Sequence, residues 1–141
     1  MNKSHKTAIT RNTVSRPMRY LAGKALIQGE ALDYGCGKGF DADACGMKKY
    51  DPYFAPECPV DQFDTITCNY VFNVIDSPFE REILLERLQE LLKPGGKAYI
   101  TVRRDIKNEG YTKRNTYQEN IVLNLKTVHK TSSFEIYELT K

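Results

Sequence analysis

The chain has 141 residues, of which 40% are hydrophobic and 28% charged, with a formal net charge of +3 at pH 7. This length suits a single core, so we expect residues 1–141 to form one domain. No run of about 18 apolar residues is present, which excludes a membrane-spanning helix. The basic, polar start lacks the apolar stretch of a secretory signal, so we expect a cytoplasmic protein without a membrane partner.

The cysteines argue against zinc and against disulfides. Cys36, Cys45, Cys58 and Cys68 show no CxxC spacing, and the chain has only two histidines. A structural zinc site needs clustered Cys or His ligands, so we expect no metal. Cys36 and Cys68 fall at the ends of predicted buried strands, which is typical of reduced thiols.

Positive charge is concentrated at the two ends of the chain. The first 29 residues carry six Lys or Arg and no acid, whereas residues 101–141 carry eight against five acids. If the ends meet in space, they form a patch that attracts the phosphates of a nucleic acid or nucleotide. A solvated basic surface explains the pattern equally well, so charge alone does not decide.

In chain order, the first elements are an arm, a helix and a strand. Residues 1–14 lack periodicity and are interpreted as a basic arm. Ser15 and Pro17 favour the start of a helix, whose apolar face continues towards Gly29. A short buried strand at 31–33 follows and runs into a glycine-rich loop.

The rest of the chain continues the alternation. We expect a brief helix at residues 40–45, a short strand at 47–50 and a loop at 52–62. A longer strand at 63–70 and a capped helix at 78–92 follow. The next expected elements are a strand at residues 97–102 and a basic loop at 103–116. A closing hairpin has its two strands at 119–128 and 133–139. Partial helix over 117–125 is the alternative to the first hairpin strand. The pattern predicts an α/β fold with a mostly parallel sheet and an antiparallel C-terminal hairpin.

The glycine loop lies where sheets of this kind bind ligands, at the carboxyl end of a strand. Gly35, Gly37 and Gly39 permit a tight turn and a close approach of a ligand to the backbone. A dinucleotide fingerprint needs a glycine at position 40, which is Phe40, and the GK[ST] ending of a nucleotide P-loop is absent. The remaining pattern is G-x-G-x-G with Asp33 two residues upstream.

This pattern resembles motif I of class I S-adenosylmethionine-dependent methyltransferases, which have a Rossmann-like fold. The resemblance implies S-adenosylmethionine as cofactor, with its amino acid part and ribose inside the loop and Asp33 near its amino group. Asp51 ends the next predicted strand, where the family places an acid on the ribose hydroxyls. A carboxylate there can accept a hydrogen bond from both hydroxyl groups. An unrelated α/β domain with a glycine turn is the alternative.

The resemblance extends over residues 5–90. The segments that carry it are 5–16, Leu32-Asp33-Tyr34-Gly35-Cys36-Gly37, Asp51-Pro52-Tyr53-Phe54 and Asn69-Tyr70-Val71-Phe72-Asn73-Val74-Ile75. They are similar to the family of DNA phosphorothioation-associated methyltransferases. This chain is shorter than a full-size member around the second and third strands, because only twelve residues separate Asp51 from Asp64. Asp61 is a candidate for the adenine contact, with an ordinary surface acid as the alternative.

Candidate catalytic residues follow the strand 63–70. Transfer of a methyl group from a sulfonium is an in-line displacement, so alignment and exclusion of water can replace a visible acid or base. Asn69 can offer its amide to an amine or to the cofactor. Tyr70 can face the sulfonium, because an aromatic ring attracts a cation. The segment lacks the Asn/Asp-Pro-Pro-Tyr and Pro-Cys motifs of base-specific DNA methyltransferases.

The arm supplies the remaining candidates. If it closes as a lid, Lys6 or Arg11 can pair with the methionine carboxylate and His5 can act as a base. A free basic tail is the alternative. A basic, aromatic segment between 103 and 117 suits a nucleic acid or nucleotide, and equally an exposed loop.

Three functions remain open at this point. The first is methylation of a nucleic acid or nucleotide, which the basic ends and the resemblance favour. The second is methylation of a small molecule or protein side chain, and the third is a non-catalytic binding module with the same fold. With so short a chain, a dimer or a partner protein can complete the acceptor pocket.

Overall fold

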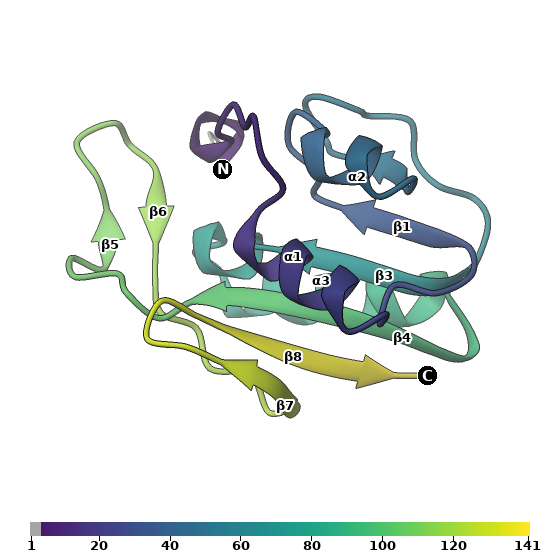
Figure 1. The fold of residues 1–141 in the computed structure, drawn as a ribbon. Coiled ribbons are helices and arrows are strands. Elements are labelled where there is room, and N and C mark those ends of the chain that lie inside the picture. Colours follow the sequence, from purple (N-terminus) through teal and green to yellow (C-terminus); the bar gives the residue numbers. More distant parts are fainter. Residues whose placement is uncertain (1–3) are drawn as a thin grey trace.

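The computed structural model describes residues 4–141, so residues 1–3 of the predicted arm lie outside the described residues. Its centre is a six-stranded sheet in the order β2-β1-β3-β4-β8-β7 (Figure 1). The strands are β1 (Ala31–Tyr34), β2 (Lys48–Tyr50), β3 (Phe63–Asn69), β4 (Leu92–Arg103), β7 (Lys126–Lys130) and β8 (Phe134–Thr140). The first four pair in parallel, and β8 joins β4 and β7 antiparallel. The predicted mixed sheet is confirmed.

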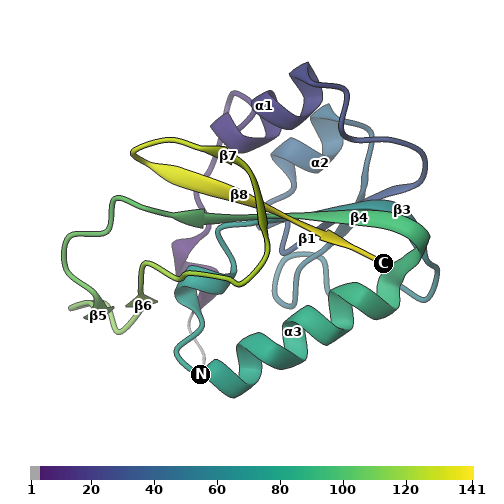
Figure 2. The same cartoon turned by 90° about the horizontal axis from the view of Figure 1, so that it is seen from below.

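Helices cover both faces of the sheet. The helices α1 (Arg16–Gly23) and α2 (Phe40–Ala44) lie on one face and α3 (Pro78–Leu91) lies on the other (Figure 2). Short 3-10 turns, η1 (Ser4–Thr7) and η2 (Phe72–Val74), lie in the arm and after β3. The predicted cap at the start of α3 is present in its N-cap half, because the Ser77 hydroxyl accepts a hydrogen bond from the Glu80 N–H at 3.2 Å.

Each face of the sheet carries its own apolar cluster. On the α3 face, Leu84, Leu88 and Leu91 pack against strand residues such as Ile66 and Ile100. On the opposite face, the cluster joins α1 and α2 to the sheet through Met18, Leu21, Ala42, Tyr99, Phe134 and Ile136. Since the central strands are covered on both sides, residues of both faces are buried, as the run from Thr65 to Cys68 in β3 shows.

The sheet is short at one edge, as expected for the trimmed region. β2 has three residues and forms the edge of the described sheet. The described residues between β2 and β3 add no further strand, because 51–55 form a small turn closed by the Asp51–Ala55 bridge and 56–62 form a loop.

Several predicted boundaries were wrong. α1 ends at Gly23 instead of continuing towards Gly29, because Ala25 adopts a left-handed φ of 56°. β4 begins at Leu92, where the predicted helix was still continuing. The segment 119–125 is neither strand nor helix. The predicted basic loop contains part of a small two-stranded sheet, β5 (Gly110–Tyr111) with β6 (Tyr117–Gln118).

Candidate functional site

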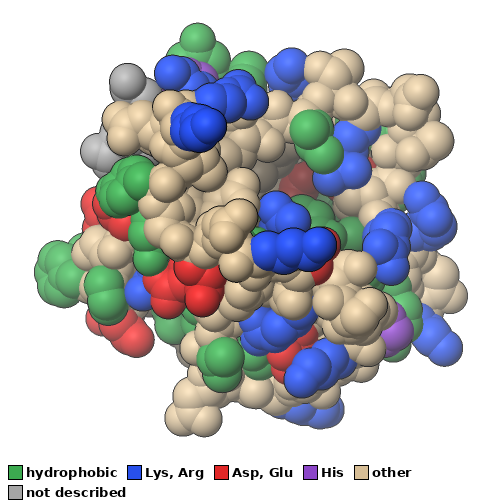
Figure 3. All heavy atoms as spheres, turned by 90° about the vertical axis from the view of Figure 1, so that its left-hand side faces the viewer, with side chains coloured by type: hydrophobic (Ala, Val, Ile, Leu, Met, Phe, Trp, Pro, Cys, Tyr) green, Lys and Arg blue, Asp and Glu red, His purple; other side chains and the backbone are tan. Residues whose placement is uncertain are grey.

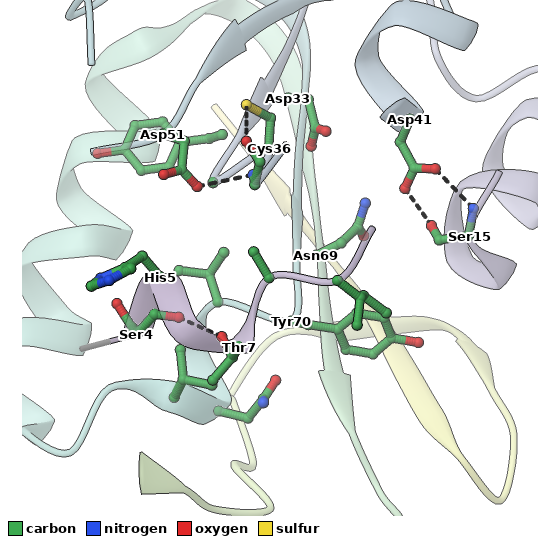
Figure 4. A pocket seen from close by; sticks show the side chains of 18 of the residues that line it. Ser4, His5, Thr7, Ser15, Asp33, Cys36, Asp41, Asp51, Asn69 and Tyr70 are labelled. Carbon is green, nitrogen blue, oxygen red and sulfur yellow. Dashed lines mark hydrogen bonds between the residues drawn. The ribbon is translucent and has the colours of Figure 1, made fainter. Parts of the chain in front are cut away.

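A cavity of about 1130 Å³ lies at the carboxyl ends of the parallel strands. Its walls come from the segments that follow β1, β2, β3 and β4, together with the arm, α3 and the start of β8. The candidate residues Asp33, Gly35, Gly37, Gly39, Asp51, Asn69, Tyr70 and Arg11 all line it. In Figure 4, Ser4, His5 and Thr7 of the arm lie opposite Asp51 and Cys36. The fold therefore brings separate parts of the chain to one site, as expected for a sheet of this type.

The glycine loop is held against the end of β2. The N–H groups of Gly35 and Cys36 both donate to the Tyr50 carbonyl, at 2.7 and 3.0 Å. Gly35 has a φ of 80°, and a Cβ atom built on it would lie 2.4 Å from the Val71 Cγ2 atom. Only glycine satisfies both the left-handed backbone and this close packing.

Asp51 connects β2 to the glycine loop through its side chain. Its Oδ2 atom accepts a hydrogen bond from the Gly37 N–H at 2.9 Å. Its Oδ1 atom accepts from the N–H groups of Tyr53 and Phe54, at 2.9 and 3.1 Å. An ionised carboxylate has about four lone-pair sites, so it keeps capacity for a ligand.

Asp33 is buried at the end of β1, with a side chain in the cavity wall. Its Oδ1 atom accepts a hydrogen bond from the Thr67 hydroxyl at 2.8 Å. Burial raises the pKa of Asp33 from 3.8 to about 7, and the nearby negative charges of Asp41 and Asp51 add to the rise. The site thus contains a carboxyl group that titrates near neutral pH.

Ser15 joins the start of α1 to α2 rather than capping its own helix. Its backbone N–H and its hydroxyl both donate to the buried Asp41 carboxylate, at 2.8 and 2.5 Å. Ser15 occupies the N-cap position of α1, as expected, but its side chain makes no capping hydrogen bond. These bonds fix the point where the arm leaves the helix layer.

The arm lies against the glycine loop and the turn after β2. The His5 ring stacks on the Tyr53 ring with centroids 4.0 Å apart and planes 8° apart. The Lys38 ammonium group donates to the Thr10 hydroxyl at 2.7 Å. Arg11 lines the cavity, whereas Lys6 is exposed and is not among the residues of the cavity wall.

Unpartnered polar atoms lie at the end of β3. Within residues 4–141, both side-chain atoms of the Asn69 amide are buried without a hydrogen-bond partner. The Oδ1 atom of Asn73, a residue that is 1% exposed, is in the same state. Both residues line the cavity. Buried amide groups without partners are costly, so these atoms are suited to bind a ligand.

Tyr70 has a left-handed backbone, with a φ of 61°, directly after β3. Its N–H donates to the Thr101 carbonyl at 2.8 Å, which holds this conformation in place. Burial raises the pKa of Tyr70, so its hydroxyl stays protonated at neutral pH. Strained non-glycine residues are concentrated at functional sites.

One wall of the cavity is apolar and was missed from the sequence. Val74, Ile75, Ile83 and Leu84 lie there, together with the half-buried Arg87. Ile83 is 48% exposed. No local motif marks this wall, because its residues come from the segment after β3 and from α3 and meet only in the folded chain.

Other charged candidates lie outside the site. Asp61 is exposed and pairs with Lys48 at 3.3 Å, so it is not placed to contact a ligand of the cavity. His129 stacks on Tyr20 with centroids 3.8 Å apart, which is a packing role. Arg104 pairs with Glu135 at 2.8 Å on the opposite face of β4 from Arg103.

The described residues contain no group of three or more His, Cys, Asp or Glu side chains that could hold a metal ion. None of the helices found among residues 4–141 is long and apolar enough to cross a membrane. The cysteines described here are free thiols, and burial raises the pKa of Cys36 to about 12.

A glycine loop after β1, an acid after β2 and a parallel sheet closed by an antiparallel hairpin together define a class I methyltransferase. A family model described as a methyltransferase domain matches residues 8–135. The chain therefore belongs to this methyltransferase family, and its predicted class, an S-adenosylmethionine-dependent methyltransferase, is confirmed.

Solved structures show the same fold. A Burkholderia thailandensis 1,6-didemethyltoxoflavin-N1-methyltransferase, solved with 1,6-didemethyltoxoflavin and S-adenosylhomocysteine, is similar with a TM-score of 0.64 at 18% identity, over 89% of this chain and 77% of that one. The glycopeptide N-methyltransferase MtfA has a TM-score of 0.50 at 15% identity, over 86% and 76% of the two chains. No curated protein sequence matches the chain.

Proposed function

We propose that this chain methylates a nucleotide or another nucleotide-sized polar molecule that enters the cavity beside Asn69 and Tyr70. The observation that carries this proposal is the Asn69 amide, whose two polar atoms are buried without a partner among the described residues. The amide can accept a hydrogen bond from an amino group and donate one to a ring nitrogen or carbonyl. Such paired donors and acceptors are typical of nucleobase-like rings.

The cofactor side of the cavity fits S-adenosylmethionine, which supplies an electrophilic methyl group when bound. Gly35, Gly37 and Gly39 have left-handed backbones and line the cavity, where the amino acid part of the cofactor would lie. Asp51 is already oriented by the Gly37 N–H and would accept hydrogen bonds from the ribose hydroxyls. Asp33 would lie near the amino group, where its ionised form would favour a cation.

The arm completes the cofactor side as a lid. His5 on Tyr53 and Thr10 on Lys38 hold it across the glycine loop. Arg11 lies in the cavity wall and would pair with the cofactor carboxylate. Lys6 was the alternative partner, but its exposed position makes Arg11 the better candidate.

The protein's contribution to the reaction is positioning and exclusion of water. Asn69 would hold the acceptor nitrogen in line with the reacting carbon, and the half-buried Tyr70 ring would face the sulfonium. Tyr70 stays protonated, so we assign it no role as a base at neutral pH.

The cavity volume supports a second, small substrate beside the cofactor. Pockets for one drug-sized ligand measure about 300–1,000 Å³, and this cavity of about 1130 Å³ exceeds that range. The 1,6-didemethyltoxoflavin-N1-methyltransferase with the same fold was solved with both 1,6-didemethyltoxoflavin and S-adenosylhomocysteine bound. A compact heterocyclic acceptor is therefore consistent with the available room.

A nucleic acid is the second candidate acceptor. The resemblance to DNA phosphorothioation-associated methyltransferases favours DNA, and the turn between β5 and β6 carries exposed Lys113 and Arg114. Tyr111 ties this hairpin to Asp76 beyond η2 by a hydrogen bond, so the basic turn lies near the cavity. Phosphate contacts from such a turn would make binding dependent on salt.

Labelled methyl transfer to nucleotides, DNA, RNA and a small-molecule extract tests the acceptor. We expect label in nucleotide-sized products, with a loss of at least tenfold in turnover for Asn69→Ala. Label confined to DNA or RNA, with salt-sensitive binding, favours the second candidate. If no acceptor is labelled although S-adenosylhomocysteine binds, the chain is a binding module and the proposed function is wrong.

A further inference from the structure

Two arginines from distant parts of the chain lie on one side of the sheet, where β4 ends and β8 begins. Arg103 pairs with Phe134 across the two strands, and directly opposite residues share a face of a sheet. Phe134 packs in the cluster under α1. The Arg16 guanidinium group lies 5.3 Å from the centre of the Phe134 ring. Arg16 and Arg103 therefore share the α1 face, and both line the cavity.

Positive charge is in excess around this point. Tyr70 packs against the same cluster as Phe134. The charges of Arg11, Arg16 and Arg103 all act on its hydroxyl group, and Asp105 acts in the opposite direction. Figure 3 shows Lys and Arg side chains around a hollow on this side of the molecule.

The two guanidinium groups keep free donors. Arg103 uses its Nε atom on the Asp105 carboxylate at 2.8 Å. Besides its position over the Phe134 ring, the Arg16 guanidinium group donates to the Ser133 hydroxyl at 3.5 Å, the outer limit of a hydrogen bond. A guanidinium group has five N–H donors, so most of them remain available for a ligand.

We propose that Arg16 and Arg103 form an anion subsite that binds a phosphate or carboxylate group of the methyl acceptor. The inference rests on the proposed function and defines the acceptor as anionic. Its reacting ring would lie on Asn69 and Asn73, and its anionic group between the two arginines. Arginine binds the paired oxygens of phosphate or carboxylate through two parallel hydrogen bonds, which gives orientation as well as affinity.

The carboxylate of the cofactor is another anion that Arg16 and Arg103 could bind. Arg11 is assigned to that carboxylate, because it belongs to the arm that lies against the glycine loop. Arg16 is instead fixed to Phe134 and Ser133 at the start of β8, and Arg103 to the end of β4. The subsite should therefore remain free when the cofactor site is filled.

A binding titration tests the subsite without knowledge of the acceptor. Inorganic phosphate and acetate are titrated into the full chain saturated with S-adenosylhomocysteine, and NMR follows the side-chain signals of Arg16 and Arg103. Arg16→Gln and Arg103→Gln should each weaken binding of the preferred anion at least about fivefold. Arg19→Gln, which removes an exposed arginine from the same helix, is the matched control and should have no effect.

The outcomes separate this inference from the proposed function. Tighter binding of phosphate or of acetate identifies the anionic group, and both results support the subsite. Equal anion affinity in Arg16→Gln, Arg103→Gln and the control overturns it, as does displacement of the anion by S-adenosylhomocysteine. If the chain fails to bind S-adenosylhomocysteine but binds phosphate through these arginines, the subsite stands and the proposed function fails. Thermal unfolding of each variant confirms that it is folded.

Discussion

The Asp51 carboxylate and the Gly37 backbone are joined by a hydrogen bond of 2.9 Å between Oδ2 and the amide nitrogen. This bond connects the end of β2 to the glycine loop, the two segments that we assign to the cofactor. The same carboxylate holds the turn after β2 through Tyr53 and Phe54. One side chain therefore shapes the loop, and we propose that it also accepts hydrogen bonds from the ribose.

Replacement of Asp51 should weaken cofactor binding strongly. Asp51→Ala removes the bonds to Gly37 and the turn, and hydrogen bonds to a charged group contribute about 1.5–3 kcal/mol. We expect S-adenosylhomocysteine affinity to fall by about 10- to 100-fold in calorimetry. Asp61→Asn, which changes an exposed acid outside the cavity, is the control. Equal losses of S-adenosylhomocysteine affinity in the two variants would show that Asp51 does not bind the cofactor.

Gly35→Ala should destabilise the fold and reduce cofactor affinity. A left-handed alanine costs about 1–2 kcal/mol, and the new Cβ would also meet the Val71 Cγ2 atom at 2.4 Å. Gly46→Ala is a matched control, since Gly46 has a φ of 67° but nothing within 4 Å of its Cβ position. Urea unfolding should show a larger loss for Gly35→Ala, partly restored by Val71→Ala. A loss no larger than that of Gly46→Ala contradicts the close packing.

Asp33 predicts a pH dependence of stability. The pKa of Asp33 is raised from 3.8 to about 7 in the folded chain. The stability that the protonated carboxyl group contributes is therefore complete below pH 3.8 and is lost as the pH rises to about 7. Between these limits the folded chain binds more protons than the unfolded chain. The free energy of unfolding of the wild type should therefore fall with pH relative to that of Asp33→Asn. If the free energies of unfolding of the wild type and Asp33→Asn change in parallel from pH 4 to 7, Asp33 does not titrate in that range.

The same carboxyl group predicts a pH dependence of binding. A cationic cofactor favours ionised Asp33, so S-adenosylmethionine affinity should rise as pH increases through about 7. Thr67→Val removes the hydrogen bond that lowers the pKa, so it should move this rise to higher pH. Fluorescence or calorimetric titrations at several pH values measure the midpoint. An unchanged midpoint in Thr67→Val would contradict the assignment.

The arm should act through the contact between His5 and Tyr53. Their stacked rings predict a coupling energy of about 0.5–1.5 kcal/mol in a double-mutant cycle on cofactor affinity with His5→Ala and Tyr53→Ala. Deletion of residues 1–14 should speed cofactor dissociation further, since Arg11 is also lost. Stopped-flow measurements give the rate. If the deletion leaves affinity and turnover intact, the arm is not a lid.

Local sequence signals predicted the parts of the fold that depend on local chemistry. The N-cap at Ser77, the glycine loop and the strand around Ile66 are each specified by residues close together in the sequence. The mostly parallel sheet with an antiparallel C-terminal pair also followed, because alternating strands and helices favour parallel pairing.

Long-range contacts explain the failures. Ser15 carries a typical N-cap side chain, but Asp41, 26 residues away, takes both of its donors. The apolar wall at Ile75 and Ile83 combines the segment after β3 with α3, and no motif marks it. The arginine pair likewise depends on the register of β4 with β8, which the residues of either strand alone do not specify.

Calorimetry of the full chain with S-adenosylhomocysteine tests the central claim most directly, namely that the glycine loop and Asp51 form a cofactor site. We predict one site per chain with a Kd in the micromolar range, about 1–100 μM, which is usual for enzyme ligands. In Asp51→Ala the binding heat should largely disappear at the same ligand concentrations. Absence of binding to the folded wild-type chain at millimolar ligand, or undiminished binding to Asp51→Ala, would contradict the account.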